Sequence, residues 1–282
     1  MKTAVITGAS SGIGLVVARE LARDGWRVIA QGRNPERAQT ALGEIRAAAP
    51  GAEVEMLLAD LSVMSSVAQF ADRVSAITSS IDLLVNNAGG TPAERVETAD
   101  GLEQTFAANH LAVFLLTNRL LPLLKTAPNS QIITTASVAH KFIKDMKWND
   151  LQQVESFKAS DAYTQSKLAN ILFTRELARR VEGDGIRANC VHPGLVQTNF
   201  DSHGDFVVRM MYLLSKPFSL NPEQGADTIL WLARGGAPDV TGRYFAKRKP
   251  GSMTPAAQND ENAKRLWQIS EDLVARAGQP VN

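Results

Sequence analysis

The chain has 282 residues, of which 44% are hydrophobic and 21% are charged, and its formal net charge is +1. These values are ordinary for a soluble globular protein, and they give no reason to expect nucleic acid or a charged membrane surface as a partner. A single cysteine excludes an intrachain disulfide and suits a reducing, cytoplasmic location. With the four scattered histidines it forms no metal-ligand spacing, so no metal is expected.

The start of the chain and its longest apolar stretch bear on targeting and membranes. The chain enters a strand-like run at once, over residues 3–7, so we expect no signal peptide. The apolar stretch 111–124 is interrupted by Asn118 and Arg119, which makes it too short and too polar to span a bilayer. We therefore expect no membrane span.

Strand and helix signals alternate along the chain. Apolar, β-branched runs predict strands over 3–7, 27–31, 54–58, 81–85, 131–135, 186–191 and 242–246. Apolar spacing and capping residues predict helices over 13–23, 35–49, 62–77, 101–121, 161–180 and 222–233. Near-continuous apolar strands joined by helices indicate a doubly wound α/β fold with a mostly parallel sheet, covered on both faces. No linker, repeat or composition shift divides the chain, so residues 1–282 are predicted to form one domain.

A glycine-rich turn joins the first strand to the first helix, with the sequence Thr7-Gly8-Ala9-Ser10-Ser11-Gly12-Ile13-Gly14. Glycines in this place permit a tight turn, and the helix N-terminus offers free N–H groups to phosphate oxygens. The spacing is Gly-x-x-x-Gly-x-Gly rather than Gly-x-Gly-x-x-Gly. The turn therefore predicts a dinucleotide site, to which Ser10 and Ser11 can add hydroxyl donors; a purely geometric turn is the alternative.

The residues after the second strand bear on which dinucleotide binds. An acidic residue is expected there when the adenine ribose has a free 2′-hydroxyl. This chain has Gln31-Gly32-Arg33-Asn34 instead. A guanidinium binds phosphate well, so Arg33 favours NADP(H) over NAD(H), with a solvated surface charge as the alternative.

Tyr163 and Lys167 lie four residues apart in a predicted helix, so both side chains share one face. A nearby cation favours the phenolate and lowers the pKa of a tyrosine toward the range useful for proton transfer. The spacing alone is common on helix surfaces, and other motifs are needed to give it weight.

Those motifs occur in order along the chain: the glycine turn, Asp60-Leu61, Asn86-Asn87-Ala88-Gly89, Asn109, Ser137, Tyr163 with Lys167, and Pro193-Gly194 followed by Val196 and Thr198. Together they resemble the TGxxxGxG and YxxxK signature of the short-chain dehydrogenases/reductases over roughly residues 1–200. Within that family the chain looks most similar to the retinol-dehydrogenase-like and WW-domain-oxidoreductase-like branch. The features that suggest this branch are the arginine after the second strand, the run 109–117 and a long gap between Ser137 and Tyr163, which indicates an insertion near 140–158.

The resemblance implies a Rossmann fold and hydride transfer between a nicotinamide and a carbonyl or alcohol carbon. It implies that Tyr163 is the general acid, that Ser137 hydrogen-bonds the reacting oxygen, that Lys167 binds the nicotinamide ribose and lowers the Tyr163 pKa, and that Asn109 positions a relay water. The cofactor-binding residues that it implies are Gly8, Ser10, Ser11, Gly12, Ile13, Gly14, Arg33, Asn34, Asp60, Leu61, Asn87, Ala88, Gly89, Tyr163, Lys167, Pro193, Gly194, Val196 and Thr198.

Several of these residues have a plainer structural interpretation that the sequence leaves open. Asp60 can serve the start of the following helix, and Asn109 can satisfy a backbone group. His110 is expected to be packed or hydrogen-bonded rather than catalytic. Cys190, in an apolar strand, is expected to be a buried small residue.

The C-terminal third is expected to carry substrate specificity. Within residues 195–220 the stretch 206–214 is apolar and rich in methionine, which suits a lid over a lipophilic ketone, aldehyde or alcohol; a packed amphipathic helix is the alternative. Phe142 and Trp148 are candidates for the opposite wall. The tail over 254–282 is predicted to be a solvated amphipathic helix.

Two other functions remain open at this point. One is a regulator that binds NADP(H) without turnover, although the intact set of Asn109, Ser137, Tyr163 and Lys167 argues against it. The other is a related enzyme that reduces a carbon–carbon double bond or epimerises a sugar. The oligomeric state is open between monomer, homodimer and homotetramer, with the predicted helices near 101–121 and 161–180 as the family's usual contact surfaces.

Overall fold

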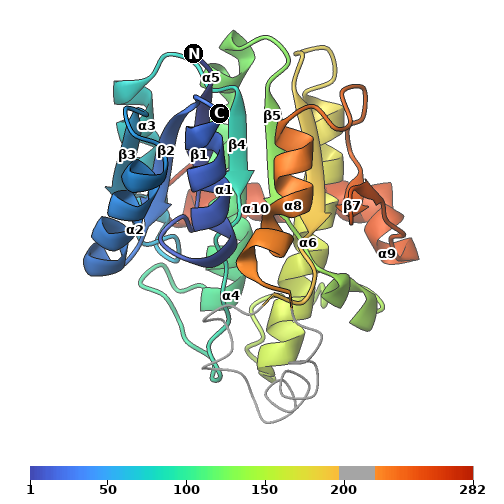
Figure 1. Ribbon diagram of the computed structural model, residues 1–282. Helices are drawn as coiled ribbons and strands as arrows, with labels where there is room; N and C mark the ends of the chain where they lie inside the picture. The colour runs from blue at the N-terminus through green and yellow to red at the C-terminus, as the bar shows by residue number, and fades with distance from the viewer. Residues whose placement is uncertain (197–219, 282) are drawn as a thin grey trace.

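The computed structural model describes residues 1–196 and 220–281, which form a central sheet with helices on both faces (Figure 1). The strand order is β3-β2-β1-β4-β5-β6-β7-β8. Strands β1 to β7 pair in parallel, and β8 runs antiparallel to β7. The bounds are β1 Thr3–Ile6, β2 Arg27–Gly32, β3 Val54–Leu58, β4 Leu83–Asn86, β5 Gln131–Thr135, β6 Arg187–His192, β7 Tyr244–Ala246 and β8 Lys249–Pro250. The mostly parallel doubly wound sheet is therefore confirmed; β8, a two-residue strand, was not predicted.

Two apolar layers hold the helices to the sheet. One layer joins the sheet to α1 Gly12–Arg23, α2 Pro35–Ala48 and α8 Pro222–Ala233. The other joins it to α3 Met64–Ile77, α5 Ala112–Thr126 and α6 Ala159–Arg180. Helices α2 and α8 begin at asparagine caps followed by proline, as the sequence predicts.

The strand order places a topological switch point at β1. The chain moves outward from β1 to β2 and β3, then crosses back to β4 on the other side of β1. The carboxyl ends of β1 and β4 therefore diverge toward oppositely directed connections, which is where ligands bind in open α/β sheets. The glycine turn follows one of these ends and Asn87 follows the other.

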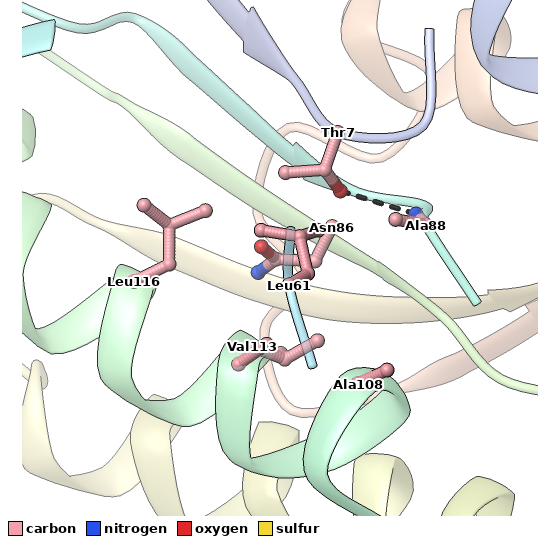
Figure 2. A pocket seen from close by; sticks show the side chains of 8 residues that line it. Thr7, Leu61, Asn86, Ala88, Ala108, Val113 and Leu116 are labelled. Atoms are coloured by element: carbon pink, nitrogen blue, oxygen red, sulfur yellow. Dashed lines mark hydrogen bonds between the residues drawn. The ribbon is translucent and has the colours of Figure 1, made fainter. Parts of the chain in front are cut away.

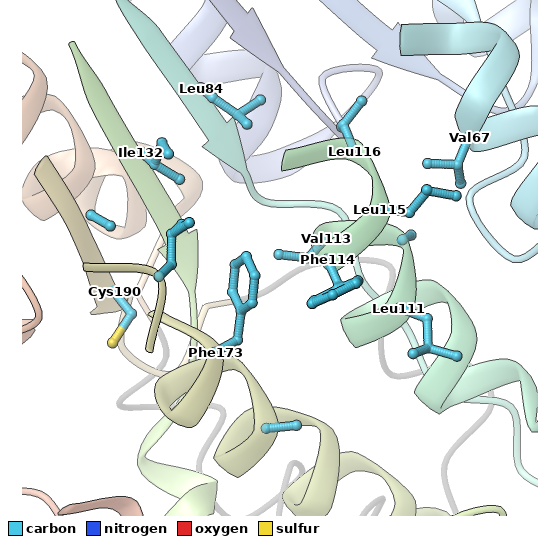
Figure 3. Packing of buried hydrophobic residues seen from close by; sticks show 14 of the residues in the cluster. Val67, Leu84, Leu111, Val113, Phe114, Leu115, Leu116, Ile132, Phe173 and Cys190 are labelled. Carbon is cyan, nitrogen blue, oxygen red and sulfur yellow. The ribbon is translucent and has the colours of Figure 1, made fainter. Parts of the chain in front are cut away.

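The helix predicted over 101–121 is longer than expected and changes pitch. It comprises α4 Gln104–Phe106, a π-helical turn η1 Ala107–Leu111, and α5. By length and composition alone, the helical span Gln104–Thr126 is long and apolar enough to cross a membrane, and 67% of its most apolar part is buried inside the protein. The expectation that residues 111–124 are too short and too polar to span a bilayer is thus wrong by length and by composition, because the helix runs past Asn118 and Pro122 to Thr126. Phe114 of this helix packs against Phe173 of α6 beneath the sheet (Figure 3).

The C-terminal tail corrects another expectation. It forms α9 Pro255–Gln258 and α10 Asp260–Arg276, and α10 is not simply a solvated helix. Trp267 of α10 stacks on Phe173 with ring centroids 5.7 Å apart, and it meets the edge of Phe114 at 4.9 Å. Its amphipathic pattern therefore reflects burial against α6 and α5, and α10 covers part of the helical surface through which relatives were expected to associate.

Candidate active site

The glycine turn adopts backbone conformations that favour glycine. Gly8 has φ of +67° and Gly12 has φ of +55°, in the left-handed region. A Cβ on Gly14 would lie 2.3 Å from the Gly8 carbonyl oxygen, so only glycine allows α1 to begin this close to the turn. Ser11 is the N-cap of α1 and its side chain makes no capping hydrogen bond, while Ile13 is buried beneath the turn. The first N–H groups of α1 are thus not capped by this side chain.

Side chains behind the turn tie it to the loop after β4. The Thr7 hydroxyl oxygen accepts the backbone N–H groups of Asn87 at 3.0 Å and of Ala88 at 3.1 Å, and the Asn87 side chain donates to the Thr7 carbonyl at 3.1 Å. Figure 2 shows the Thr7–Ala88 bond beside a narrow crevice under these loops. The crevice is lined by Thr7, Leu61, Asn86, Ala88, Ala108, Ala112, Val113 and Leu116. The predicted residues Leu61, Asn87 and Ala88 therefore meet the glycine turn at the switch point.

At the end of β2, Gln31 and Asn34 hold nearby backbone, whereas Arg33 is exposed. The buried Gln31 side chain accepts the Gly8 N–H at 2.9 Å and donates to the Ala59 carbonyl at 2.7 Å, so it fixes the turn. Asn34 caps α2 by accepting a first-turn backbone N–H at 2.9 Å. Arg33 lies between them and is exposed. The side chains of Gln31 and Asn34 are therefore hydrogen-bonded to backbone groups, and the Arg33 side chain lies at the surface.

Asp60 follows β3 and shapes the approach to α3. Its Oδ1 accepts the N–H of Ser62 at 2.9 Å and the hydroxyl of the same residue at 2.7 Å, and its N–H donates to Ser66 Oγ at 2.9 Å. These bonds shape a turn ahead of α3, but the N-cap of that helix is Val63 and the N–H of Met64 bonds Asp100 Oδ2 at 2.8 Å, so Asp60 does not cap the helix. Binding of the adenine edge by Asp60 stays a prediction.

Tyr163 and Lys167 lie on α6, one turn apart as predicted. The Lys167 ammonium is 5.5 Å from the centre of the Tyr163 ring and donates to the Thr135 carbonyl, at the end of β5, at 3.1 Å. Burial lowers the pKa of Lys167 from 10.5 to about 8. At neutral pH this lysine therefore still carries its charge, close to the phenol.

Asn109 lies in the π-helical turn, a local widening that is frequent at functional sites. Its Oδ1 accepts the Gly90 N–H at 2.9 Å and its Nδ2 donates to Ser166 Oγ at 3.1 Å. A Cβ on Gly89 would lie 3.2 Å from Asn109 Oδ1 and 3.5 Å from the Lys167 ammonium nitrogen. Asn109 therefore satisfies a backbone group, and it also lies in the same cluster as Lys167; the relay water stays a prediction.

Ser137 follows β5 and is the N-cap of η2 Val138–Phe142, a short 3₁₀ helix. Its Oγ accepts the Ala139 N–H at 3.1 Å, which leaves the hydroxyl hydrogen available to a ligand oxygen. Because Lys167 is bonded to the carbonyl of Thr135 at the end of the same strand, Ser137 and Lys167 lie at one edge of the sheet.

Pro193 and Gly194 follow β6, at that same edge. Gly194 has φ of +93°, and a Cβ there would lie 2.4 Å from the Leu220 side chain. Val196 pairs with Leu220 in an isolated parallel bridge. Thr198 and most of the predicted lid over 195–220 lie outside the described residues.

Sequence reasoning missed Asn170, a residue that shares the hydrogen-bond acceptor of Lys167. Asn170 Nδ2 donates at 3.2 Å to the Thr135 carbonyl, the same oxygen that Lys167 binds. One turn of helix separates Asn170 from Lys167, and this helical spacing was a usable signal.

His110, expected to be packed or hydrogen-bonded, is buried and its ring bonds Ser270 of α10 at 2.9 Å; burial lowers its pKa to about 4.

Cys190 and the two predicted pocket-wall residues differ in their exposure and contacts. Cys190 is buried as expected, and burial raises the pKa of its thiol to about 12. Trp148, a predicted pocket wall, lies under the Arg265 guanidinium of α10 at 4.4 Å. Phe142 is 73% exposed. Within the described residues, no group of three or more His, Cys, Asp or Glu side chains is placed to hold a metal ion.

The geometry fits a dinucleotide. The pyrophosphate would take the uncapped N-terminus of α1, where the glycines let a ligand approach the backbone closely. The nicotinamide end would lie beyond β4 and β5, where Gly89, Lys167 and Asn109 converge. The exposed Arg33 would lie at the other end, beside the adenine ribose.

Comparisons with known proteins agree with this arrangement. The family model of the short chain dehydrogenases matches residues 2–204. Human retinol dehydrogenase 14 is 40% identical over 97% of this chain and 86% of its own length, and bovine retinol dehydrogenase 12 is 39% identical with the same coverage. A short-chain dehydrogenase from Burkholderia cenocepacia, solved in complex with NADP, is 25% identical, covers 92% of this chain and 98% of its own, and has a TM-score of 0.70. The chain therefore belongs to the short-chain dehydrogenase family and is an oxidoreductase of that family.

Proposed function

We propose that this protein transfers hydride between NADP(H) and the carbonyl or alcohol carbon of a lipophilic substrate. The observation that carries the proposal is the convergence of three groups at the end of β5. The Lys167 ammonium bonds the Thr135 carbonyl, stands 5.5 Å from the Tyr163 ring, and shares this edge of the sheet with Ser137. A pure nucleotide binder has no need for this set.

A nicotinamide bound beside Lys167 and Asn109 would supply the hydride in carbonyl reduction and accept it in the reverse direction. The Ser137 hydroxyl donates a hydrogen bond to the carbonyl oxygen and holds it in line. As hydride reaches the carbon and the C=O π bond breaks, the oxygen takes the phenolic proton of Tyr163. The positive charge of Lys167 stabilises the phenolate that remains.

The preference for NADP(H) rests on Arg33 and its neighbours. Arg33 is exposed directly after β2, and Gly32 beside it packs close to Ser10 of the glycine turn, where an added Cβ would lie 3.0 Å from the Ser10 Cβ. A guanidinium and a hydroxyl are thus available on one side of the adenine ribose site. Both suit a 2′-phosphate, and the related Burkholderia protein was solved with NADP.

The proposal of a lipophilic substrate rests on two exposed apolar side chains near the carboxyl ends of β5 and β6. We call this region, with Ser137, Tyr163 and Lys167, the catalytic edge. Phe142, 73% exposed, ends the 3₁₀ helix that begins after Ser137, and Leu195, 56% exposed, follows β6. An apolar ligand bound at this end of the sheet would remove apolar surface of these side chains from water. The retinol dehydrogenase names of the relatives agree with that substrate class.

The function is tested by following NADPH consumption with aldehydes and ketones of increasing chain length. We expect turnover that rises with chain length, with the alcohol as product. Phe142→Ser should raise KM for the longest substrates and leave the shortest unchanged. NADPH binding without turnover of any carbonyl would favour the regulator instead, and a saturated ketone formed from an enone would favour double-bond reduction.

The cofactor preference has a separate test. Arg33→Ala should raise the Kd of NADPH by about tenfold or more and leave the Kd of NADH nearly unchanged, because only the 2′-phosphate contact is removed. Arg276→Ala, another exposed arginine on α10, is the charge-matched control. Equal changes for both cofactors in Arg33→Ala would show that Arg33 does not bind the 2′-phosphate.

A further inference from the structure

We propose that His140 is a positioning residue, which holds Ser137 in its reactive orientation through a hydrogen bond to the Ser137 main-chain carbonyl. The inference rests on the proposed function, because it adds a residue to the same site. His140 lies in η2, and no part of the mechanism above uses it. Its side chain is completely buried.

The contact between these residues is short and directional. His140 Nδ1 lies 2.6 Å from the Ser137 carbonyl oxygen. A carbonyl can only accept, so Nδ1 carries the hydrogen and the imidazole is in its Nδ1–H tautomer. The same carbonyl accepts the His140 backbone N–H at a longer 3.3 Å. The imidazole therefore makes the shorter of the two bonds.

This bond is one of three hydrogen bonds that fix the side chain and the carbonyl of Ser137. The Ser137 Oγ accepts the Ala139 N–H at 3.1 Å, while its carbonyl accepts the two His140 donors. Fixing the carbonyl fixes the peptide plane that follows Ser137, and the Ala139 N–H fixes the oxygen of its side chain. Without the imidazole, one long 3₁₀ bond is left to hold this carbonyl.

The imidazole is itself held by the sheet. Its ring meets the Tyr244 ring edge-on, with centroids 5.1 Å apart and an interplanar angle of 69°. Tyr244 belongs to β7 and pairs with Cys190 of β6. Gly251 packs against the Tyr244 ring, where a Cβ would lie 2.7 Å from a ring carbon. The position of Ser137 is thus tied, through His140, to the sheet as well as to its own strand.

A buried histidine with an unpaired ring nitrogen lowers the stability of the fold here, which indicates that its hydrogen-bond donor is needed. His140 Nε2 is buried without a hydrogen-bond partner among the described residues, and so is Nδ1 of the neighbouring His192. An apolar side chain of similar size would avoid that cost. Burial and the nearby Lys141 lower the pKa of His140, so the ring is neutral at neutral pH. What histidine offers over an apolar residue is the Nδ1–H donor.

Two polar substitutions separate the donor from the side chain as a whole. Asparagine bears its N–H₂ on Cγ, where histidine bears Nδ1, whereas glutamine carries it one bond further out. We expect H140N to keep kcat within about threefold of wild type and H140Q and H140L to lose about thirtyfold, all with little change in the Kd of NADPH. Equal kcat in all three variants, or an equal loss in all three, would overturn the inference. If H140L does not fold, the comparison of H140N with H140Q decides.

A second measurement does not depend on turnover. The Ala139 N–H, bonded to Ser137 Oγ, should exchange with solvent deuterium about tenfold faster in H140Q than in wild type and at near-wild-type rate in H140N. A wild-type protein without carbonyl turnover would refute the proposed function, and this exchange difference would still test His140. An exchange rate unchanged in H140Q would show that the imidazole does not hold the turn.

Discussion

The glycine turn and the catalytic edge differ in how their buried polar groups are satisfied. Around the turn, Gln31 and Thr7 use their side chains to bind backbone groups of neighbouring strands and loops, although Asn86 keeps one unpaired oxygen. Near the catalytic edge, several buried atoms have no partner among the described residues. They are Thr134 Oγ1, Thr135 Oγ1, His140 Nε2, Asn170 Oδ1 and His192 Nδ1.

The difference indicates what each region is built for. The turn offers backbone N–H groups in a fixed shape, and the side chains of Gln31 and Thr7 hold that shape. The catalytic edge carries a buried ammonium and unpaired polar atoms that cost stability. Native proteins tolerate such costs chiefly at functional sites. The two regions should therefore respond differently to substitution, the first through cofactor binding and the second through turnover.

Tyr163→Phe should give the largest effect, and it tests the catalytic edge alone. We expect kcat to fall by about 10²–10⁴-fold, since only the proton donor is removed. The Kd of NADPH, measured by fluorescence titration, should stay within about threefold, because the ring remains in place.

Tyr244→Phe is the matched control, since it removes a phenolic hydroxyl from a residue that packs on His140 and is not assigned to the chemistry. Its kcat should stay near that of wild type. Near-normal turnover in Tyr163→Phe would contradict the proton-donor role, and an equal loss in both variants would point to a general disturbance of this edge.

Gly14→Ala should act on the turn. A Cβ would lie 2.3 Å from the Gly8 carbonyl oxygen, so α1 has to shift and its N–H groups leave the phosphate site. We expect the Kd of NADPH to rise about a hundredfold, with a loss of stability of about 2–3 kcal/mol. Isothermal titration and thermal unfolding would measure the two effects.

Gly43→Ala provides the control for this change. Gly43 lies in α2, and an added Cβ would meet no atom within 4 Å. Alanine there should stabilise the protein by about 0.5–1 kcal/mol and leave cofactor binding alone. If Gly14→Ala behaves like Gly43→Ala, the turn does not depend on close backbone approach.

The pH profile of carbonyl reduction should report Lys167. Its pKa of about 8 means that the ammonium is lost as pH rises through 8, and with it the charge beside Tyr163. We expect kcat/KM, which reports the free enzyme, to fall by about tenfold per pH unit above that value. A profile that stays flat to pH 10 would show that turnover does not need this charge.

The turn was the more predictable region because its signals are local. Glycines at fixed spacing, flanked by a strand and a helix, specify the backbone of residues 7–14 almost without help from the rest of the chain. Likewise, the spacing of Tyr163 and Lys167 needed only helical geometry. The fold followed from the alternation of apolar strands and helices, which the structure confirms.

What the sequence did not predict depends on distant contacts. Asn170 and Lys167 share the Thr135 carbonyl only because α6 packs on β5. The sequence predicts a solvated helix for the tail, because the Phe114 and Phe173 surface on which Trp267 packs is formed by distant parts of the chain. His140 has no periodic signal, since its role arises from a 3₁₀ turn and a neighbouring strand.

On folding stability, measured in the cofactor-free protein, Lys167→Met should have a small effect, which reports the cost of burying this ammonium. Burial holds the pKa of Lys167 near 8, below its ordinary 10.5, so the folded state disfavours the charged form. Below pH 8 the lysine is charged in both states and the full cost is present, and methionine should stabilise the protein there by about 1 kcal/mol. Thr135 keeps a donor in this variant, because Asn170 still bonds its carbonyl.

The sign of the pH dependence makes this prediction specific. As pH rises from about 8 to 10.5, the folded wild-type protein loses the Lys167 proton before the unfolded chain does, so its stability rises. The advantage of Lys167→Met should therefore shrink over that interval, as followed by urea unfolding at each pH. A variant less stable than wild type at pH 7 would show that the buried ammonium contributes to the fold, and the contrast with the glycine turn would then lie in chemistry alone.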